Sequence, residues 1–353
     1  MRQPINALPT GMRPQRITSA AVSFDVEIYR QQPGTPGADG TTPLGTLSTV
    51  RGTLEDDSAQ APARMMTVDI AKLPTWLEPG MWMRPTIGVQ MVQNVIYRLP
   101  TTIITDVDVQ PSDSQLGTIT GKDPGEVLNT RPYETDTSLS GTLRTLVASA
   151  CTVLTRTTDV SGVPNITIPK ESVAEFGAGR WDTCLDIADS LGVALRFTDD
   201  GDVVGRYREG PYPAPACIVE LIETAGALHR LRWPSMAKVL VDRGDTIGLI
   251  GVCTADQVTG TATPAWYPPY VITDTQQGDS TTTQATADSL AKGLLISKLA
   301  ELDSFESLPI LPSPWLEAGA DVVDLRSKSY GLRAVTVDLP SLATSVTLRR
   351  IPW

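Results

Sequence analysis

Short stretches of alternating apolar and polar residues, broken by glycine and proline, are the feature that most constrains this sequence. The clearest is 20–29, where Val22, Phe24, Val26 and Ile28 fall on one side of an extended chain. Turn residues separate it from similar stretches at 45–54, 64–70, 84–91, 97–109 and 117–120. Short strands at this spacing are typical of barrels and sandwiches. Glycine and proline make up 56 of 353 residues, more than the usual ~12%, which favours turns over long helices.

In the middle of the chain, apolar residues no longer recur at every second position but at the spacing of a helix. Apolar residues follow helical spacing over 143–150 and 181–191, and Gly192 stands where the second helix would end. A hairpin is predicted next, with strands at 193–197 and 203–207 around an Asp-Gly turn. The middle of the chain is therefore expected to be a small α/β domain.

Strands return in the last third, together with one long helix over 281–302. The expected strands lie at 238–242, 246–254, 321–325, 331–337 and 345–351. The whole order predicts a mixed, mainly β chain in which two barrel or sandwich domains flank the α/β domain. The expected units are an N-terminal arm at 1–16, a first β domain at 17–135, the α/β domain at 136–235 and a second β domain at 236–353.

Charge and histidine content exclude many functions. The chain has 29 basic and 40 acidic residues, a net charge of -11, which argues against a protein that grips nucleic acid through its phosphates. DNA that only slides past is compatible with it. His229 is the single histidine, so the commonest general base and zinc ligand is almost absent. The alternation around His229 predicts a place on the solvent side of a strand.

The four cysteines, Cys151, Cys184, Cys217 and Cys253, form no CxxC pair, and we expect them to be reduced and buried. No apolar run approaches the ~18 residues of a membrane span, and the first residues lack a secretory pattern. We therefore expect no membrane insertion, and a chain made in the cytoplasm.

Motifs that carry chemistry are missing from the sequence. It has no Gly-x-Ser-x-Gly elbow, no phosphate-binding Gly-x-x-x-x-Gly-Lys loop and no Gly-x-Gly-x-x-Gly. The acids of 199–202 do not alternate as in a calcium loop, so a solvated hairpin turn is expected there. The sequence therefore predicts no enzyme, and no catalytic, cofactor or metal residues.

Three segments together resemble a known family. The long helix runs into Leu-Pro-Ile-Leu-Pro at 308–312, then Trp-Leu-Glu-Ala-Gly-Ala-Asp-Val-Val-Asp-Leu at 315–325 and two closing strands. The helix ending in Leu-Gly at 191–192 leads through a strand to the Asp-Gly turn, and a weaker match spans 50–68. In this order the chain resembles the tail hub (baseplate hub) and minor tail proteins of tailed bacteriophages, and it is similar to hubs of contractile injection systems.

The resemblance implies a structural role at the tail tip of a virion, assembled in the host cytoplasm. It implies a homotrimer in which two tail-tube-like β domains per subunit form a pseudo-sixfold ring. That ring would join the sixfold tail tube and distal tail protein to a threefold fibre, spike or needle formed by a separate chain. It would also enclose the channel for the tape measure protein and for DNA in transit, with a lining that is acidic or neutral.

Two alternatives remain at this point. Exposed aromatic residues could make the chain a carbohydrate-binding, receptor-recognition protein, with candidates Trp76, Trp82, Trp266, Tyr267 and Tyr270. A tail-associated cell-wall hydrolase would need a pair of carboxylates, and no stretch resembles a lysozyme. Binding to host cell walls rather than to tail proteins would separate these from a hub.

The loop over 31–43 is the candidate partner contact. It has no large apolar residue, so it cannot bury a face of its own and is expected to be mobile in the free chain. Its centre carries Pro33, Gly34, Pro36 and Gly37. We expect these residues to become ordered against a partner chain, with a surface loop of no special role as the alternative.

Overall fold

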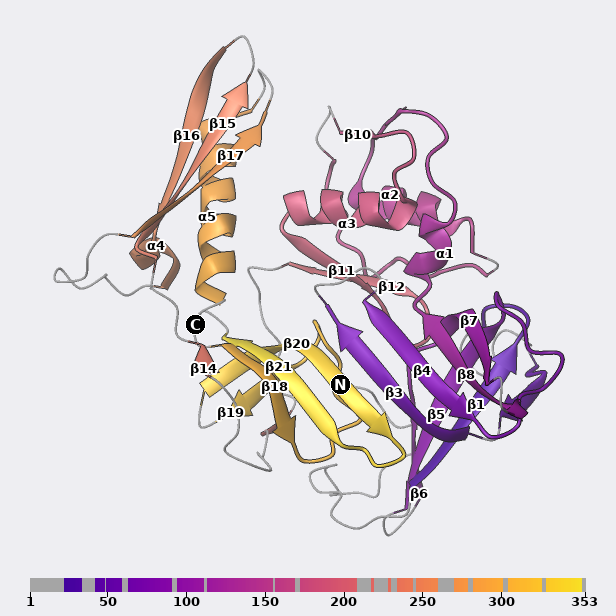
Figure 1. Cartoon of the computed structure of the whole chain (residues 1–353). Coiled ribbons are helices and arrows are strands. Elements are labelled where there is room, and N and C mark those ends of the chain that lie inside the picture. The colour runs from indigo at the N-terminus through magenta and orange to yellow at the C-terminus, as the bar shows by residue number, and fades with distance from the viewer. Residues whose placement is uncertain are drawn as a thin grey trace.

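The computed structural model confirms a mainly β chain with a few helices. It describes residues 22–33, 42–47, 49–58, 63–90, 94–110, 113–154, 156–168, 172–207, 217–218, 228–229, 234–243, 246–259, 270–278, 282–300, 304–325 and 328–350. The N-terminal arm expected at 1–16 lies outside these residues. Three bodies are visible in Figure 1, a large sheet with two smaller units above it.

The large sheet has 14 strands, and it takes them from both ends of the chain. Its first part comprises β1 (Val22–Tyr29), β2 (Gly45–Leu47), β3 (Thr49–Asp57), β4 (Arg64–Ile70), β5 (Trp82–Gln90), β6 (Asn94–Arg98), β7 (Thr102–Gln110) and β8 (Asp113–Lys122). Its second part comprises β13 (Cys217–Ile218), β14 (Leu228–His229), β18 (Ser304–Ile310), β19 (Val322–Leu325), β20 (Lys328–Leu339) and β21 (Thr344–Arg350). The two parts join where β20 pairs antiparallel with β3.

Alternating side chains give this sheet one buried face. In β4 every second residue is buried, and Met66, Val68 and Ile70 enter the same core as Val337 and Val346 of the second part. A continuous core therefore holds the two ends of the chain together. The expected strand at 97–109 is two strands, β6 and β7, because Pro100 interrupts it and proline cannot donate to a ladder.

A helical unit follows β8 and has a second core, which Tyr29 of β1 and Trp82 of β5 also enter. It comprises α1 (Gly125–Asn129), β9 (Thr137–Ser138), α2 (Leu143–Cys151), β10 (Val173–Ala174), α3 (Arg180–Ser190), β11 (Val193–Phe197) and β12 (Val203–Tyr207). Thr142 and Thr145 cap α2 reciprocally, and Gly192 takes a φ of 69° after α3, as the sequence predicts. Both predicted helices and the hairpin are confirmed. An isolated bridge joins Thr167 to Thr142, just before α2.

The remaining elements form an inserted lobe, residues 234–300. They are β15 (Met236–Arg243), β16 (Thr246–Thr254), α4 (Ala255–Thr259), β17 (Val271–Gln277) and α5 (Gln284–Ala300). The strands lie in the order β16-β15-β17, and α5 packs on one face through a core that includes Val239, Cys253 and Leu295. At Gly251 a Cβ atom would lie 1.8 Å from the backbone oxygen of Ala287, so only glycine permits this approach.

The lobe is an insertion into the large sheet, because β14 before it pairs with β18 after it. The second β domain expected at 236–353 is thus divided in the structure. Its first part forms the lobe with a separate core, and its last strands complete the large sheet.

Cys151, Cys184 and Cys253 are buried thiols, as expected. Burial raises the pKa of the Cys151 thiol to about 12. Burial also raises the pKa of the Cys184 thiol, and the nearby Cys151 raises it further. Cys217 lies in β13. Within the described part of the chain, no helix is long and apolar enough to cross a membrane.

Candidate functional site: the charged junction around Arg64

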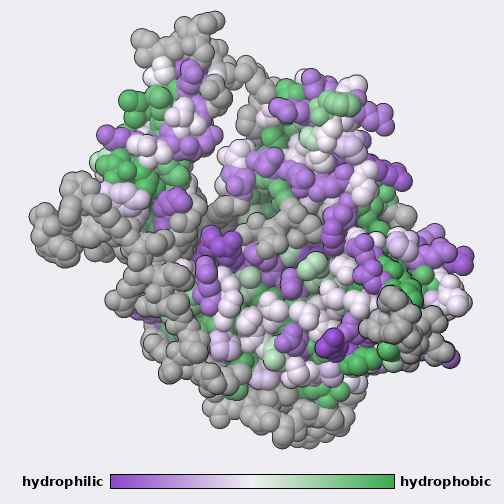
Figure 2. All heavy atoms as spheres, viewed as in Figure 1, coloured by the Kyte–Doolittle hydropathy of each residue, from purple (hydrophilic) through white to green (hydrophobic). Residues whose placement is uncertain are grey.

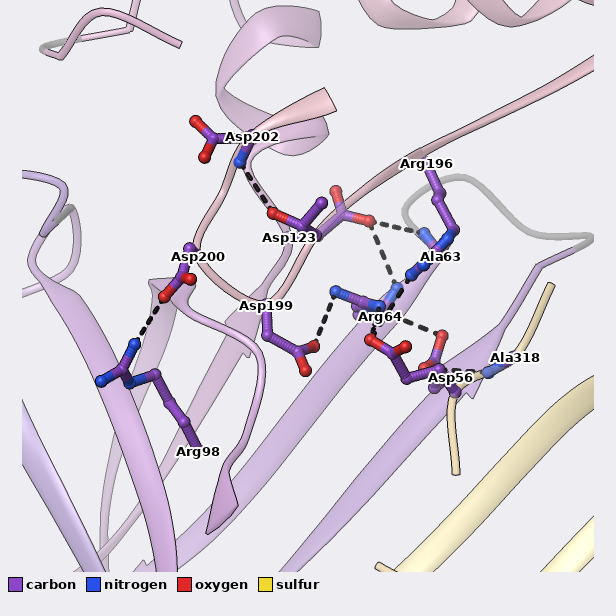
Figure 3. A network of polar contacts seen from close by, with 12 residues as sticks. Asp56, Ala63, Arg64, Arg98, Asp123, Arg196, Asp199, Asp200, Asp202 and Ala318 are labelled. Atoms are coloured by element: carbon purple, nitrogen blue, oxygen red, sulfur yellow. Dashed lines mark hydrogen bonds and ion pairs between the residues drawn. The ribbon is translucent and has the colours of Figure 1, made fainter. Parts of the chain in front are cut away.

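The most distinctive site is a buried arginine where the large sheet meets the helical unit (Figure 3). Arg64 begins β4 on the inward side of its alternation, and only 2% of it is exposed. Its Nη1 lies 3.1 Å from Asp199 Oδ1, its Nε 3.4 Å from Asp56 Oδ1 and its Nη2 3.8 Å from Glu317 Oε1. One guanidinium therefore contacts three carboxylates.

These carboxylates come from three different parts of the fold. Asp56 lies in β3, Asp199 in the turn between β11 and β12, and Glu317 in the segment between β18 and β19. Asp56 also reaches the last of these segments directly, since its Oδ2 accepts a hydrogen bond from Ala318 N at 3.3 Å. The junction thus joins the helical unit to both parts of the large sheet.

A fourth carboxylate, Asp123, ties the backbone of β4 to α1. Its Oδ2 accepts hydrogen bonds from Ala63 N at 2.8 Å and Arg64 N at 3.3 Å, and its Oδ1 accepts one from Gly125 N at 2.9 Å. Complete burial raises the pKa of Asp123 to about 6, although Arg64 and the three backbone donors favour its ionised form.

Arg64 stays charged in this setting. Burial on its own would lower the pKa of Arg64, but the surrounding carboxylates raise it above its usual value. Glu317 has a second cation nearby, with Arg196 Nη1 at 3.6 Å, and its backbone N–H donates to Asp321 Oδ2 at 2.9 Å. The junction is a connected network of charges rather than a single ion pair.

The turn between β11 and β12 is inserted into this network. Asp199 contacts Arg64, Asp200 Oδ1 lies 2.6 Å from Arg98 Nη1, and Asp202 forms an ion pair with Arg156. The hairpin turn is present as expected, but the expectation that it is solvated is wrong, because its acids form ion pairs within the fold. The sequence shows three clustered acids, but it does not show which arginines the fold places opposite them.

Two further contacts hold the same turn against the sheet. Thr101 N donates to the backbone oxygen of Asp199 at 3.0 Å. Gly201 is buried with a φ of 83°, and a Cβ there would lie 2.5 Å from Nε2 of the buried Gln32. Glycine is required at this position both for its backbone conformation and for the close packing.

The predicted partner-contact loop is only partly described. Pro33 is buried, beside Gln32 and thus near the acidic turn. Gly34, Pro36 and Gly37 lie outside the described residues, so their contact with a partner stays a prediction. His229 lies in β14 opposite Ser304, so the predicted strand is present, whereas its place on the solvent side stays a prediction.

The aromatic candidates for sugar binding do not form a platform among the described residues. Trp82 is 3% exposed, Trp76 is 40% exposed and packs near Gly45, and Tyr270 is half-buried. Trp266 and Tyr267 lie outside the described residues. Within the part of the chain that the structure describes, no group of three or more His, Cys, Asp or Glu residues is placed to hold a metal ion.

Comparison with protein-family models and with curated proteins finds no match to this sequence. Solved structures do match it. A tail protein from Neisseria meningitidis aligns with a TM-score of 0.58 at 14% identity, covering 93% of this chain and 96% of the other.

Two prophage proteins agree with this match. A tail protein of a Shewanella oneidensis prophage has a TM-score of 0.56 at 13% identity, with 93% and 98% covered. A prophage tail protein of Listeria monocytogenes has a TM-score of 0.56 at 11% identity, with 92% and 94% covered. Over nearly its whole length, the chain has the fold of bacteriophage tail proteins.

Proposed function

We propose that this protein is a structural hub of a phage tail tip, in which three copies form a ring around a channel. The observation that carries the proposal is the likeness to tail proteins over more than nine-tenths of the chain. The two-part sheet supports it, because β1–β8 and β18–β21 would give each subunit two tube-like segments. Three subunits would then present six segments to a sixfold tube.

The outer face of the large sheet has the chemistry of a channel lining. The inner face of the sheet packs into the hydrophobic core. The outer face is polar across six neighbouring strands, β7, β8, β4, β3, β20 and β21. Figure 2 shows pale and purple atoms over much of this face. Its outward residues include Thr53, Glu55, Asp57, Thr67, Asp69, Asp106, Asp108, Thr118, Thr120, Thr336, Asp338, Ser345 and Thr347.

The charges on this face support a lining that does not hold DNA. Two of its cations are neutralised locally, since Arg51 pairs with Asp69 and Arg333 Nε lies 3.8 Å from Asp57 Oδ1. Threonine and carboxylate groups would leave the phosphate backbone without strong partners. A polyanion would therefore remain free to move along the face.

The charged junction is suited to a structural role, in which it holds two units of the fold in a fixed relative position, rather than to catalysis. Arg64 and the acidic turn fix the helical unit on the sheet through several contacts at once. A ring that must match a tube on one side and a tip on the other needs such fixed geometry. The distal tail protein, the tape measure protein and a fibre or spike would be its neighbours in the virion tail tip, and it would not act as an enzyme.

The mass of the purified full chain in solution tests the proposal. Light scattering over a range of concentrations should give three times the 37.8 kDa of one chain. A chain that stays monomeric at high concentration and cleaves peptidoglycan would contradict it. Shortening the loop at 34–40 to a tight turn should weaken incorporation into tails if that loop contacts a partner, whereas unchanged incorporation would leave it as an ordinary surface loop.

A further inference from the structure

The inserted lobe presents a sheet face that its own helix does not cover. α5 packs against the inward side of β15 and β16, and the other side carries four exposed apolar side chains. Leu240 is 45% exposed, Ile250 57%, Val252 39% and Val271 39%. Contiguous apolar surface of this kind marks interaction sites in soluble proteins.

These side chains form one patch around a lysine. Lys238 pairs with Val252 across β15 and β16, and Leu240 pairs with Ile250 in the same way. Val271 lies opposite Met236, one same-face position from Lys238. We call this set the lobe face. Lys238 is exposed at its centre, and no ion pair joins it to another described residue.

The β16 edge of the same sheet is blocked near its middle by side chains of α5. Gln284 Nε2 of α5 donates to the backbone oxygen of Ile250 at 2.9 Å, and Asp288 Oδ1 accepts from Val252 N at 3.1 Å. These side chains occupy two backbone groups of β16 that would otherwise be open to another strand. The exposed apolar side chains lie on the face of the sheet, so we expect a partner to bind there.

A second apolar patch lies on the helical unit, in the turn after β10. Phe176 is 74% exposed, the highest value among the exposed large hydrophobic residues described, and Val173 nearby is 51% exposed. Glu175 lies between them in sequence, exposed and without an ion pair to another described residue. We call these three residues the Phe176 turn.

Hydrogen bonds hold this turn in one conformation. Phe176 N donates to Asp136 Oδ1 at 2.8 Å, and Gly177 N donates to Tyr133 O at 2.9 Å. Ala178 N donates to the oxygen of Glu175 at 3.1 Å, which closes the turn. An exposed aromatic side chain on a fixed turn is suited to act as an interface anchor, because little entropy is lost when it binds.

We propose that the lobe face of one copy binds the Phe176 turn of the next copy. The two patches match in chemistry, since an apolar patch with an exposed lysine would meet an exposed aromatic side chain beside an exposed glutamate. The patches differ, so the contact is heterologous, and such a contact closes into a ring when its rotation permits. This inference rests on the proposed trimer and names the surfaces that build it.

Charge exchange in the full chain tests the contact. Lys238→Glu and Glu175→Lys should each weaken the trimer, raising the concentration at which half the chains are assembled by about tenfold or more, because each places like charges together. The double variant should recover assembly close to that of the original protein. Lys72→Glu, the same change at an exposed lysine in the loop between β4 and β5, should leave assembly unchanged.

The apolar half of the contact has its own variant. Phe176→Ser should weaken assembly without lowering the midpoint of unfolding, because the side chain is exposed. Tyr207→Ser is the matched control, since Tyr207 is an aromatic residue elsewhere on the helical unit and is 47% exposed. If the original protein is a trimer and the single variants assemble normally, or the double variant shows no recovery, the contact is refuted and the trimer stands. If the original protein is a monomer, the proposed hub fails, and the contact fails with it.

Discussion

Replacement of Arg64 by methionine is the sharpest perturbation of the junction. It keeps an unbranched side chain in the core but leaves Asp56, Asp199 and Glu317 without their shared cation at a buried site. Removing one partner of a buried ion pair destabilises a protein by about 3–5 kcal/mol. We therefore expect Arg64→Met to lower the free energy of unfolding by an amount in this range.

Arg51 supplies the matched control. It lies on neighbouring β3 and forms an ion pair with Asp69, but 77% of its side chain is exposed. Exposed pairs contribute about 0–1 kcal/mol, so Arg51→Met should have little effect. Urea unfolding followed by tryptophan fluorescence and by circular dichroism would measure both variants, with equal slopes required for the comparison.

The same variant should open a specific part of the fold. Without Arg64, the turn at Asp199 loses one of its attachments to the sheet, so amide exchange should accelerate in β11, β12 and at Thr101, whose N–H donates to Asp199. Exchange in the inserted lobe should not change. The reasoning would be refuted if Arg64→Met were as stable as Arg51→Met, or if its exchange increased uniformly.

Other features make further predictions. Folding raises the pKa of Asp123 to about 6. Its contribution to the free energy of unfolding is therefore complete below about pH 4 and is lost as the pH rises through 6. Asp123→Asn should remove this loss of stability between pH 4 and 6 when urea unfolding is measured against pH. Gly251→Ala should destabilise the inserted lobe by about 1–3 kcal/mol through overpacking, seen as faster exchange there, whereas Gly293→Ala on α5, where a Cβ has nothing within 4 Å, should stabilise it by about 0.5–1 kcal/mol. Burial raises the pKa of Cys151 and Cys184, so neither thiol should react with a disulfide reagent at pH 8 until the protein unfolds; rapid reaction in the native state would contradict their burial.

The sequence predicts the local structure well where the pattern is regular. The strand at β4, the helices α2 and α3 and the hairpin β11–β12 each have a clear repeat and turn or cap residues. These signals are local, because they depend on side-chain period and backbone conformation. They also revealed the resemblance to phage tail proteins, which the likeness to solved tail proteins supports.

The contacts of the junction and the insertion of the lobe could not be predicted from the sequence, for a physical reason. Arg64 has the same place in the alternation as Met66, and nothing near it in the sequence indicates that acids more than a hundred residues away surround it. The insertion was missed because β14 and β18 are separated by the entire lobe, so only their pairing reveals it. Contacts across such distances are set by the fold as a whole.

A cryo-electron microscopy reconstruction of the assembled full chain would show whether the polar face of the large sheet lines a channel. We expect a threefold ring in which the outward face of β3, β4, β8 and β20 lines the lumen, with threonine and carboxylate side chains such as Thr53, Glu55 and Asp338 exposed to it. A ring whose lumen is lined mainly by arginine and lysine, or an assembly that places this face against solvent on the outside, would contradict it.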